Sequence, residues 1–207
     1  NNEYDGEEYD ASKEMTGWNM IGYNDRSWMN AEPVIAPPGQ IRAQMSEAMK
    51  AMQTIQPFSI KKTASGNYIL DMGQNFSGWI KLKNINGKKG QQIVLRFAES
   101  LQSNGELFVA NLRDAKVTDV YTFGNKSLGA TGWEPSFVYH GFRYVEISSF
   151  PGTPQLNQFE GKLVFDALST TGSFQTSNEI INRIYQNAWW GIASNYKGMP
   201  VDCPQRN

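Results

Sequence analysis

QQIVLRFAE, residues 91–99, alternates apolar and polar side chains with a period of two. Ile93, Leu95 and Phe97 point to one side of an extended chain, whereas polar residues such as Arg96 point to the other. This alternation is typical of a strand with one buried face, because successive side chains of a strand lie on opposite faces of its sheet. We therefore predict that Ile93, Leu95 and Phe97 lie in the core of a β-sheet.

The same alternation recurs on both sides of this strand, across residues 58–168. Turn-forming residues separate the alternating runs, at residues 86–90, 103–105 and 150–154. Several short strands between such turns indicate an antiparallel sandwich or barrel. We predict a mainly β fold in which residues 55–168 form an antiparallel β-sandwich.

One alternating run, GFRYVEI at residues 141–147, supports a more detailed prediction. If the alternation is regular, Phe142 and Tyr144 lie on one face of the strand. Val145 and Ile147 then lie on the opposite face.

The residues that precede the sandwich follow other patterns. Residues 1–31 are acidic and rich in tryptophan, and they are too few to hold a core alone. Residues 31–40 carry three prolines and a glycine, which is typical of a connector. For residues 41–56 extended structure is favoured over a helix. The first 54 residues are thus predicted to be the tail of a preceding β domain and a connector.

After the sandwich the period changes to three and four. Ser177 is the predicted N-cap of a helix that ends near Tyr196, before Gly198 and Pro200. The helix has a broad apolar stripe, made of Ile180, Ile181, Ile184, Tyr185, Ala188, Trp189, Ile192 and Ala193. Because such a stripe needs a second surface to cover it, residues 169–207 are predicted to begin a further, helical domain.

Composition limits the classes of partner. The 207 residues include 19 Lys plus Arg and 20 Asp plus Glu, for a net charge of −1. No basic run exists to neutralise phosphates, so nucleic acid is not an expected partner, and a neutral sugar fits better. With Cys203 as the only cysteine and His140 as the only histidine, neither a disulfide framework nor a metal site of these residue types is expected. No cofactor is expected either.

The N-terminal residues lack the basic and apolar regions of a signal peptide, and no apolar run is long enough for a membrane span. A signal that was removed before the sequence begins is compatible with a periplasmic or secreted location. That location is favoured here over the cytoplasm.

Four stretches of the chain resemble motifs of the bacterial α-L-rhamnosidases, glycoside hydrolase family 78. They are LDMGQNFSGWIKL (residues 70–82), NLRDAKVTDVY (111–121), WEPSFVYHGFRYVEI (133–147) and PVDCPQRN (200–207). GWNMIGYNDRSW, residues 17–28, is a weaker fifth, in which Tyr23 and Asn24 depart from the common form. The resemblance covers nearly the whole chain, with the motifs in the family's order.

The resemblance implies that the sandwich precedes a catalytic (α/α)6 barrel, whose first helix and loop are residues 169–207. The family releases terminal α-L-rhamnose from rhamnosides with inversion, using two carboxylates and a water. Its general acid is a Glu shortly after the D-C-P-Q-R run, and its base is a Glu far downstream. Neither position lies within this sequence, so no catalytic residue is assigned, and the missing C-terminal catalytic domain is an expected partner. The alternative is a stand-alone, non-catalytic carbohydrate-binding or architectural sandwich.

The resemblance also implies two substrate-binding residues, Asp202 and Arg206, which stand in the family's first barrel loop. Asp202 would accept hydrogen bonds from rhamnose hydroxyl groups, and Arg206 would orient the acidic cluster. On residue type alone, both would be read as solvated loop residues.

Other chemically capable side chains are predicted to be structural. His140 lacks a neighbouring nucleophile and is expected to be a hydrogen-bonded structural histidine, and Cys203 is expected to be a small packed residue. Glu99, Asp114 and Asp119 are expected to form ordinary surface or cross-strand ion pairs.

Two further sets of residues are also weighed against binding roles. Asp5, Glu7, Glu8 and Asp10 lack the spacing of a calcium loop, so they are interpreted as a solvated charge run. Four tryptophans could form a sugar-stacking platform, but they are interpreted as core or edge residues, namely Trp18, Trp28, Trp79 and Trp133.

Overall fold

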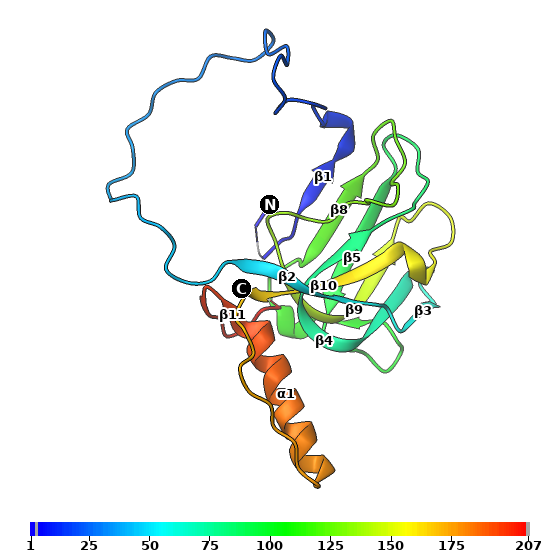
Figure 1. Ribbon diagram of the computed structural model, residues 1–207. Coiled ribbons are helices and arrows are strands. Elements are labelled where there is room, and N and C mark those ends of the chain that lie inside the picture. Colours follow the sequence, from blue (N-terminus) through cyan, green and yellow to red (C-terminus); the bar gives the residue numbers. More distant parts are fainter. Residues whose placement is uncertain (3, 206–207) are drawn as a thin grey trace.

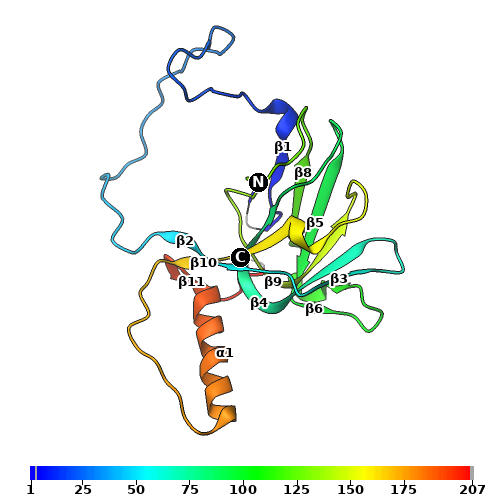
Figure 2. The ribbon, with the colours of Figure 1, turned by 45° about the vertical axis from the view of Figure 1, so that its right-hand side comes forward.

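An eight-stranded, strongly curled sheet forms most of the protein (Figures 1 and 2). The computed structural model describes residues 1–2 and 4–205. In hydrogen-bonded order the strands are β1 (Glu8–Asp10), β8 (Thr118–Thr122), β5 (Gln92–Ala98), β9 (His140–Ser148), β4 (Tyr68–Leu82), β10 (Phe159–Asp166) and β2 (Met49–Ile55); β3 (Ser59–Lys62) pairs with β4 beside this path. Among the strands of the described residues, only β1 and β8 pair in parallel. The prediction of a mainly β fold that ends in one helix is confirmed.

The longest strand, β4, bends while it remains paired with β9. The register between the two strands shifts between Asp71 and Phe76, and Gly73 has a φ of 75° inside this interval. The Asp71 carboxylate accepts a hydrogen bond from the backbone N–H of Gly73 at 2.7 Å, which fixes the bend locally. A register shift of this kind increases the local twist of the strands, and the sheet is strongly curved there.

The register shift between β4 and β9 also affects which side chains of β9 face the core. Phe142, Val145 and Ile147 are all fully buried and belong to the same core cluster. The predicted separation of Phe142 from Val145 and Ile147 onto opposite faces is therefore wrong, because it assumed an unbroken alternation through the strand.

The core lies on the concave face of the sheet. Ile93, Leu95 and Phe97 are 0%, 1% and 0% exposed, which confirms their predicted place in the core. The ring of Phe142 contacts those of Phe97 and Phe76, with centroid distances of 4.8 and 4.6 Å. Burial of each such side chain stabilises the fold by about 1.5–3 kcal/mol. A smaller cluster on the other face lies under the hairpin of β6 (Ser100–Leu101) and β7 (Leu107–Phe108).

The N-terminal segment contributes strands to both edges of the sheet. β1 and the short 3₁₀ turn after it (Ala11–Lys13) lie along β8, and the chain then makes a long exposed excursion before it returns as β2 beside β10 (Figure 1). Extended structure, predicted for residues 41–56, is confirmed over β2. The division of the chain at residues 54 and 168 stays a prediction.

The helix α1 spans Glu179–Asn195. Its N-cap is Asn178, whose side chain accepts hydrogen bonds from the backbone N–H groups of Ile180 and Ile181 at 2.9 and 3.3 Å. The prediction of Ser177 is wrong by one residue. Thr176 sets the start, because its backbone exchanges two hydrogen bonds of 2.8 Å with the Asn182 side chain.

The apolar stripe of α1 is only partly covered in the described structure. Trp189 and Trp190 pack against the core, and Trp189 contacts the ring of Phe165 on β10 at 6.2 Å. Ile180 and Ile184, nearer to the start of the helix, are 73% and 62% exposed. The C-terminal half of α1 therefore anchors the helix to the sheet.

An ion-pair cluster on β10 links that strand to the end of β4. Glu160 accepts hydrogen bonds from the ammonium groups of Lys162, at 2.8 Å, and Lys83. These two donors, Lys162 first, lower the pKa of Glu160 to about 2. A carboxyl group with a lowered pKa stabilises the fold above its unfolded-state value, and the contribution disappears as the pH falls through the folded-state value.

We expect Glu160→Gln to lower the free energy of unfolding by about 2 kcal/mol at neutral pH, the scale of lost charge-assisted hydrogen bonds. The difference from the wild type should shrink as the pH falls from 4.5 towards about 2, because the wild-type carboxyl group becomes neutral there. Urea unfolding at several pH values measures both effects. Glu32→Gln, in the exposed excursion, is the matched control. A loss that is independent of pH would contradict this account.

Candidate functional site

The candidate site is the loop that follows α1. The chain leaves the helix through a two-residue hairpin, β11 (Tyr196–Lys197) and β12 (Met199–Pro200), which turns at Gly198 with a φ of 80°. The backbone N–H of Val201 donates to the carbonyl of Asn195 at 2.8 Å, so the hairpin is tied to the helix end. Asp202 follows directly and is exposed.

Of the two residues predicted to bind substrate, the structure locates one. Asp202 lies two residues after β12, at the start of the loop. The Cys203 thiol donates a hydrogen bond to its carboxylate at 3.5 Å. Arg206 lies outside the described residues. Cys203 is half-buried beside Asp202 and has further contacts, in keeping with a packed residue.

Asp202 borders a cavity of about 450 Å³ that lies between the sheet, α1 and the loop. Its lining combines polar side chains with an indole ring and a proline ring, and includes Asn75, Glu99, Trp190, Asn195, Asp202, Pro204 and Gln205. The buried Oδ1 of Asn195 has no hydrogen-bond partner among the described residues. Carboxylates accept hydrogen bonds and amides both donate and accept them, so this lining can bind the hydroxyl groups of a neutral polyol.

The sheet contributes Gln74, Asn75 and Glu99 to this cavity, and the sequence reasoning did not assign a binding role to any of them. Glu99 was expected to form a surface or cross-strand ion pair, and none is found for it among residues 1–2 and 4–205. Its carboxylate instead accepts hydrogen bonds from the amides of Asn75 and Asn111, at 3.0 and 3.4 Å. The available signal was the polar Gln74-Asn75 pair, which interrupts the apolar alternation of β4 at its bend.

Behind the loop, Asp119 and His140 form a pair whose side chains are 1% and 0% exposed. The Nε2 atom of His140 lies 3.0 Å from Asp119 Oδ1, which also accepts the backbone N–H of Glu7 at 2.9 Å. The ring of Phe97 stacks on the imidazole at 4.3 Å. Asp119 was expected to form a surface or cross-strand ion pair. The surface alternative is wrong, because Asp119 faces inward with Val117, Tyr121 and Phe123, and its partner is the buried His140 on β9. Asp114 is exposed, and the ion pair expected for it is not found among the described residues.

Glu7 also departs from its predicted place in a solvated charge run. It is 3% exposed, and its carboxylate accepts the backbone N–H groups of Ser136 and Phe137 at 3.0 and 2.9 Å. Pairing of β1 with β8 directs this side chain under the segment that leads into β9. The charge is thus stabilised by hydrogen bonds inside the fold rather than by water.

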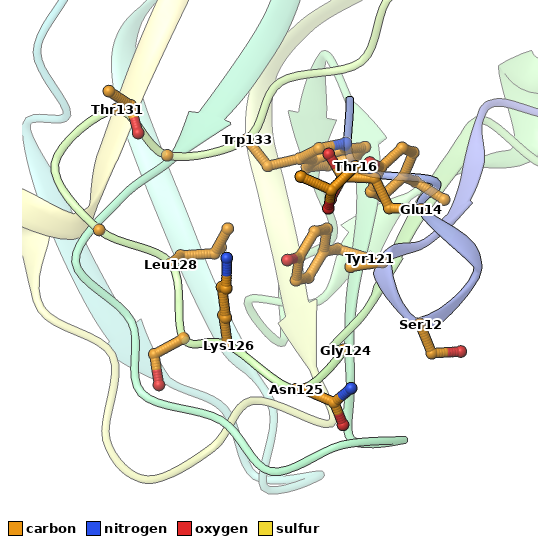
Figure 3. A pocket seen from close by; sticks show the side chains of 15 residues that line it. Ser12, Glu14, Thr16, Tyr121, Gly124, Asn125, Lys126, Leu128, Thr131 and Trp133 are labelled. Atoms are coloured by element: carbon orange, nitrogen blue, oxygen red, sulfur yellow. The ribbon is translucent and has the colours of Figure 1, made fainter. Parts of the chain in front are cut away.

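A second cavity, of about 350 Å³, opens beside β1 and β8 (Figure 3). Tyr9, Tyr121 and Trp133 form one wall, with ring centroids 5.2–5.9 Å apart. Burial, as the largest cause, raises the pKa of Tyr121. Because Tyr121 is almost fully buried within the aromatic wall, the rings serve mainly as packing.

The tryptophans considered as a stacking platform are dispersed. Trp18 and Trp28 lie in the exposed excursion. The indole N–H of Trp79 donates to the Glu134 carboxylate at 2.7 Å, whereas Trp133 packs against the core. The edge and core interpretation therefore holds for Trp79 and Trp133.

The long motif stretches contact one another across the sheet. Arg143 on β9 donates two hydrogen bonds, of 2.8 and 3.0 Å, to the Asp71 carboxylate on β4. Burial would raise the pKa of Asp71, but the hydrogen bonds from Arg143 and the Gly73 N–H outweigh it and lower that pKa. These two motif stretches therefore contribute to the pairing of β4 with β9.

In residues 1–2 and 4–205, no three His, Cys, Asp or Glu side chains converge into a group that could hold a metal ion. Over the same residues, no helix is both long and apolar enough to cross a lipid bilayer.

Family models match three consecutive parts of the chain. The bacterial alpha-L-rhamnosidase concanavalin-like domain matches residues 61–165, which is about half of the chain. The alpha-L-rhamnosidase N-terminal domain matches residues 1–53, and the bacterial alpha-L-rhamnosidase 6 hairpin glycosidase domain matches residues 169–207.

Individual proteins similar to this chain are also named alpha-L-rhamnosidases. An alpha-L-rhamnosidase of Streptomyces avermitilis is 36% identical over 98% of this chain, but the chain spans only 19% of that relative. The crystal structure of the S. avermitilis enzyme complexed with L-rhamnose superimposes with a TM-score of 0.93 at 34% identity, over 99% of this chain and 20% of that one. An alpha-L-rhamnosidase from Dictyoglumus thermophilum gives 0.91 at 40% identity, over 100% and 23%. The chain thus spans about a fifth of these relatives.

The burial of His140 leads to a prediction for the full-length protein. His140→Gln should lower the free energy of unfolding by about 2–4 kcal/mol, because it leaves the buried Asp119 carboxylate poorly paired and removes the ring contact with Phe97. We expect the melting temperature to fall more than the turnover number of the fraction that stays folded. Thermal unfolding and active-fraction kinetics measure the two. Unchanged melting with a collapsed kcat would instead assign a chemical role to His140.

Proposed function

The chain belongs to the bacterial α-L-rhamnosidase family, and we propose on that basis that it is part of a glycoside hydrolase that releases terminal α-L-rhamnose from rhamnosides. In this proposal the curled sheet precedes a catalytic (α/α)6 barrel, of which α1 is the first helix. The rest of that barrel would cover the exposed part of the α1 apolar stripe. A rhamnose-containing glycoside is the proposed substrate.

The observation that carries the proposal is the position of Asp202 at the edge of a cavity lined by amide and carboxylate groups and an indole ring. The loop of residues 200–205 carries the family's P-V-D-C-P-Q motif and leaves the helix end at that cavity. Hydroxyl-binding amides and carboxylates line the cavity together with one indole ring, and such a lining suits a neutral sugar. An anionic or strongly apolar ligand would find few complementary groups there.

The proposed reaction is hydrolysis with inversion. A carboxylic acid protonates the leaving oxygen while a second carboxylate activates a water on the opposite face of the sugar, with about 6.5–9.5 Å between the two carboxyl groups. We assign the acid to a glutamate shortly after Arg206 and the base to one much further along the full-length protein. Asp202 would bind rhamnose hydroxyl groups and, as a nearby negative charge, would raise the pKa of the acid so that it stays protonated.

We expect the 207-residue chain alone to leave an aryl α-L-rhamnoside unhydrolysed, because positioned acid and base groups supply several orders of magnitude in rate, about 10²–10⁴-fold each. Release of the aryl chromophore by the purified chain, with the full-length enzyme as positive control, measures this. Clear turnover by a preparation free of host glycosidases would contradict the assignment of the catalytic acid and base to residues beyond this chain. Saturable binding of rhamnosides by an inactive full-length protein would favour a non-catalytic carbohydrate-binding module.

In the full-length enzyme, Asp202→Asn should weaken transition-state binding by about 2–4 kcal/mol, the scale of a charged hydrogen bond together with a lost electrostatic neighbour. Without the negative charge of Asp202, the general acid loses its proton more readily, so the alkaline limb of the pH–rate profile should move to lower pH. The profile of kcat/KM against pH tests both effects. A near-normal kcat/KM with an unmoved limb would show that Asp202 is only a loop residue.

A further inference from the structure

The hairpin that leads to Asp202 is attached to β10 by two side chains. The half-buried ammonium group of Lys197 donates to the carbonyl of Val164. The backbone N–H of Gly198 donates to both carboxylate oxygens of Asp166, at 2.7 and 2.8 Å. Asp166 is itself buried, at 5% exposed. These contacts fix the chain four residues before Asp202.

The ammonium group of Lys197 is held in a site that does not favour its charge. Burial, opposed by the Asp166 charge, lowers the pKa of Lys197 to about 8. The ring of Tyr139, just before β9, lies 5.2 Å from the ammonium nitrogen. A lysine side chain without a structural role would keep its ammonium group hydrated, because removing an ammonium ion from water costs free energy. The observed position therefore indicates a specific attachment.

The chain after Asp202 is attached to the neighbouring part of the sheet. A Cβ atom at Gly141 on β9 would lie 2.7 Å from the backbone nitrogen of Gln205 and 3.0 Å from the carbonyl carbon of Pro204. Only a residue without a side chain permits this approach, because backbone atoms cannot move aside as a flexible side chain can. The Asp119–His140 pair lies directly beside Gly141 and holds this part of β9 from within.

We propose that Lys197 and Gly141 are positioning residues that set the place of Asp202 from the two ends of its loop. The proposal rests on the proposed function, since Asp202 is taken to bind the sugar. The sheet then acts as a template for a sugar-binding loop of the neighbouring domain, and Lys197 and Gly141 touch no substrate themselves. A displacement of about 1 Å is enough to reduce catalysis by up to 10²-fold, so small changes at these contacts have measurable effects.

The test uses the full-length enzyme and an aryl α-L-rhamnoside. Lys197→Met removes the donor and keeps an apolar stem, Lys197→Arg keeps a donor, and Lys50→Met is a control at an exposed lysine on β2, the strand paired with β10. We expect Lys197→Met to lower kcat/KM about 10- to 100-fold. Lys197→Arg should recover part of the loss, and Lys50→Met should match the wild type.

A double variant separates positioning from general destabilisation. If Lys197 acts through Asp202, Lys197→Met combined with Asp202→Asn should be no slower than Asp202→Asn alone. Full addition of the two losses, or a Lys197→Met enzyme as active as Lys50→Met, would overturn the proposal. If Lys197→Met fails to fold, Gly141→Ala decides by the same comparison, since the three atoms nearest to its methyl group all belong to the loop.

Amide hydrogen exchange gives a second readout that needs no activity. Residues 199–205 should exchange at least several-fold faster in Lys197→Met and Gly141→Ala than in Lys50→Met. Unchanged exchange in both variants would overturn the proposal even if activity fell. If the wild-type enzyme hydrolysed no rhamnoside, the proposed function would fail, while the exchange rates would still report whether the sheet positions the loop.

Discussion

The sheet can curl around its core only because β4 bends between Asp71 and Phe76 while it stays paired with β9. The Asp71 carboxylate holds the bend from both sides, since it accepts the Gly73 N–H and the Arg143 guanidinium together. Before the bend β4 pairs with β3, and after it β4 pairs with β10. The bend also brings Gln74 and Asn75 to the cavity beside Asp202.

Polar groups in the interior join parts of the chain that are far apart in sequence. The Asp119–His140 pair connects β8 to β9, and Glu7 connects the segment before β1 to the approach of β9. Each carboxylate accepts hydrogen bonds, some of them from backbone N–H groups, which offset the loss of hydration. These contacts converge on β9 near Gly141, against which the Asp202 loop lies. These buried contacts therefore hold the part of the sheet against which the exposed Asp202 loop packs.

Much of the fold was predictable from the sequence because it depends on local alternation. Ile93, Leu95 and Phe97 are buried as their spacing predicts, and the change of period near residue 177 marks the helix. The prediction failed at Phe142 because the register shift lies in the partner strand β4. It failed by one residue at Ser177 because Asn182, a turn further along, selects the cap through its contacts with Thr176.

The sequence by itself determined the mainly β class, the position of the helix and the motif that contains Asp202, because period, turn residues and motif spacing are properties of contiguous residues. Only the tertiary structure decided that Glu7 and Asp119 are buried and that Glu99 joins Asp202 at one cavity. It alone brings Gly141 against Gln205 and the Lys197 ammonium group against β10. Such contacts depend on which strands become neighbours and at what register, and long-range pairing is not encoded in any single stretch of the chain.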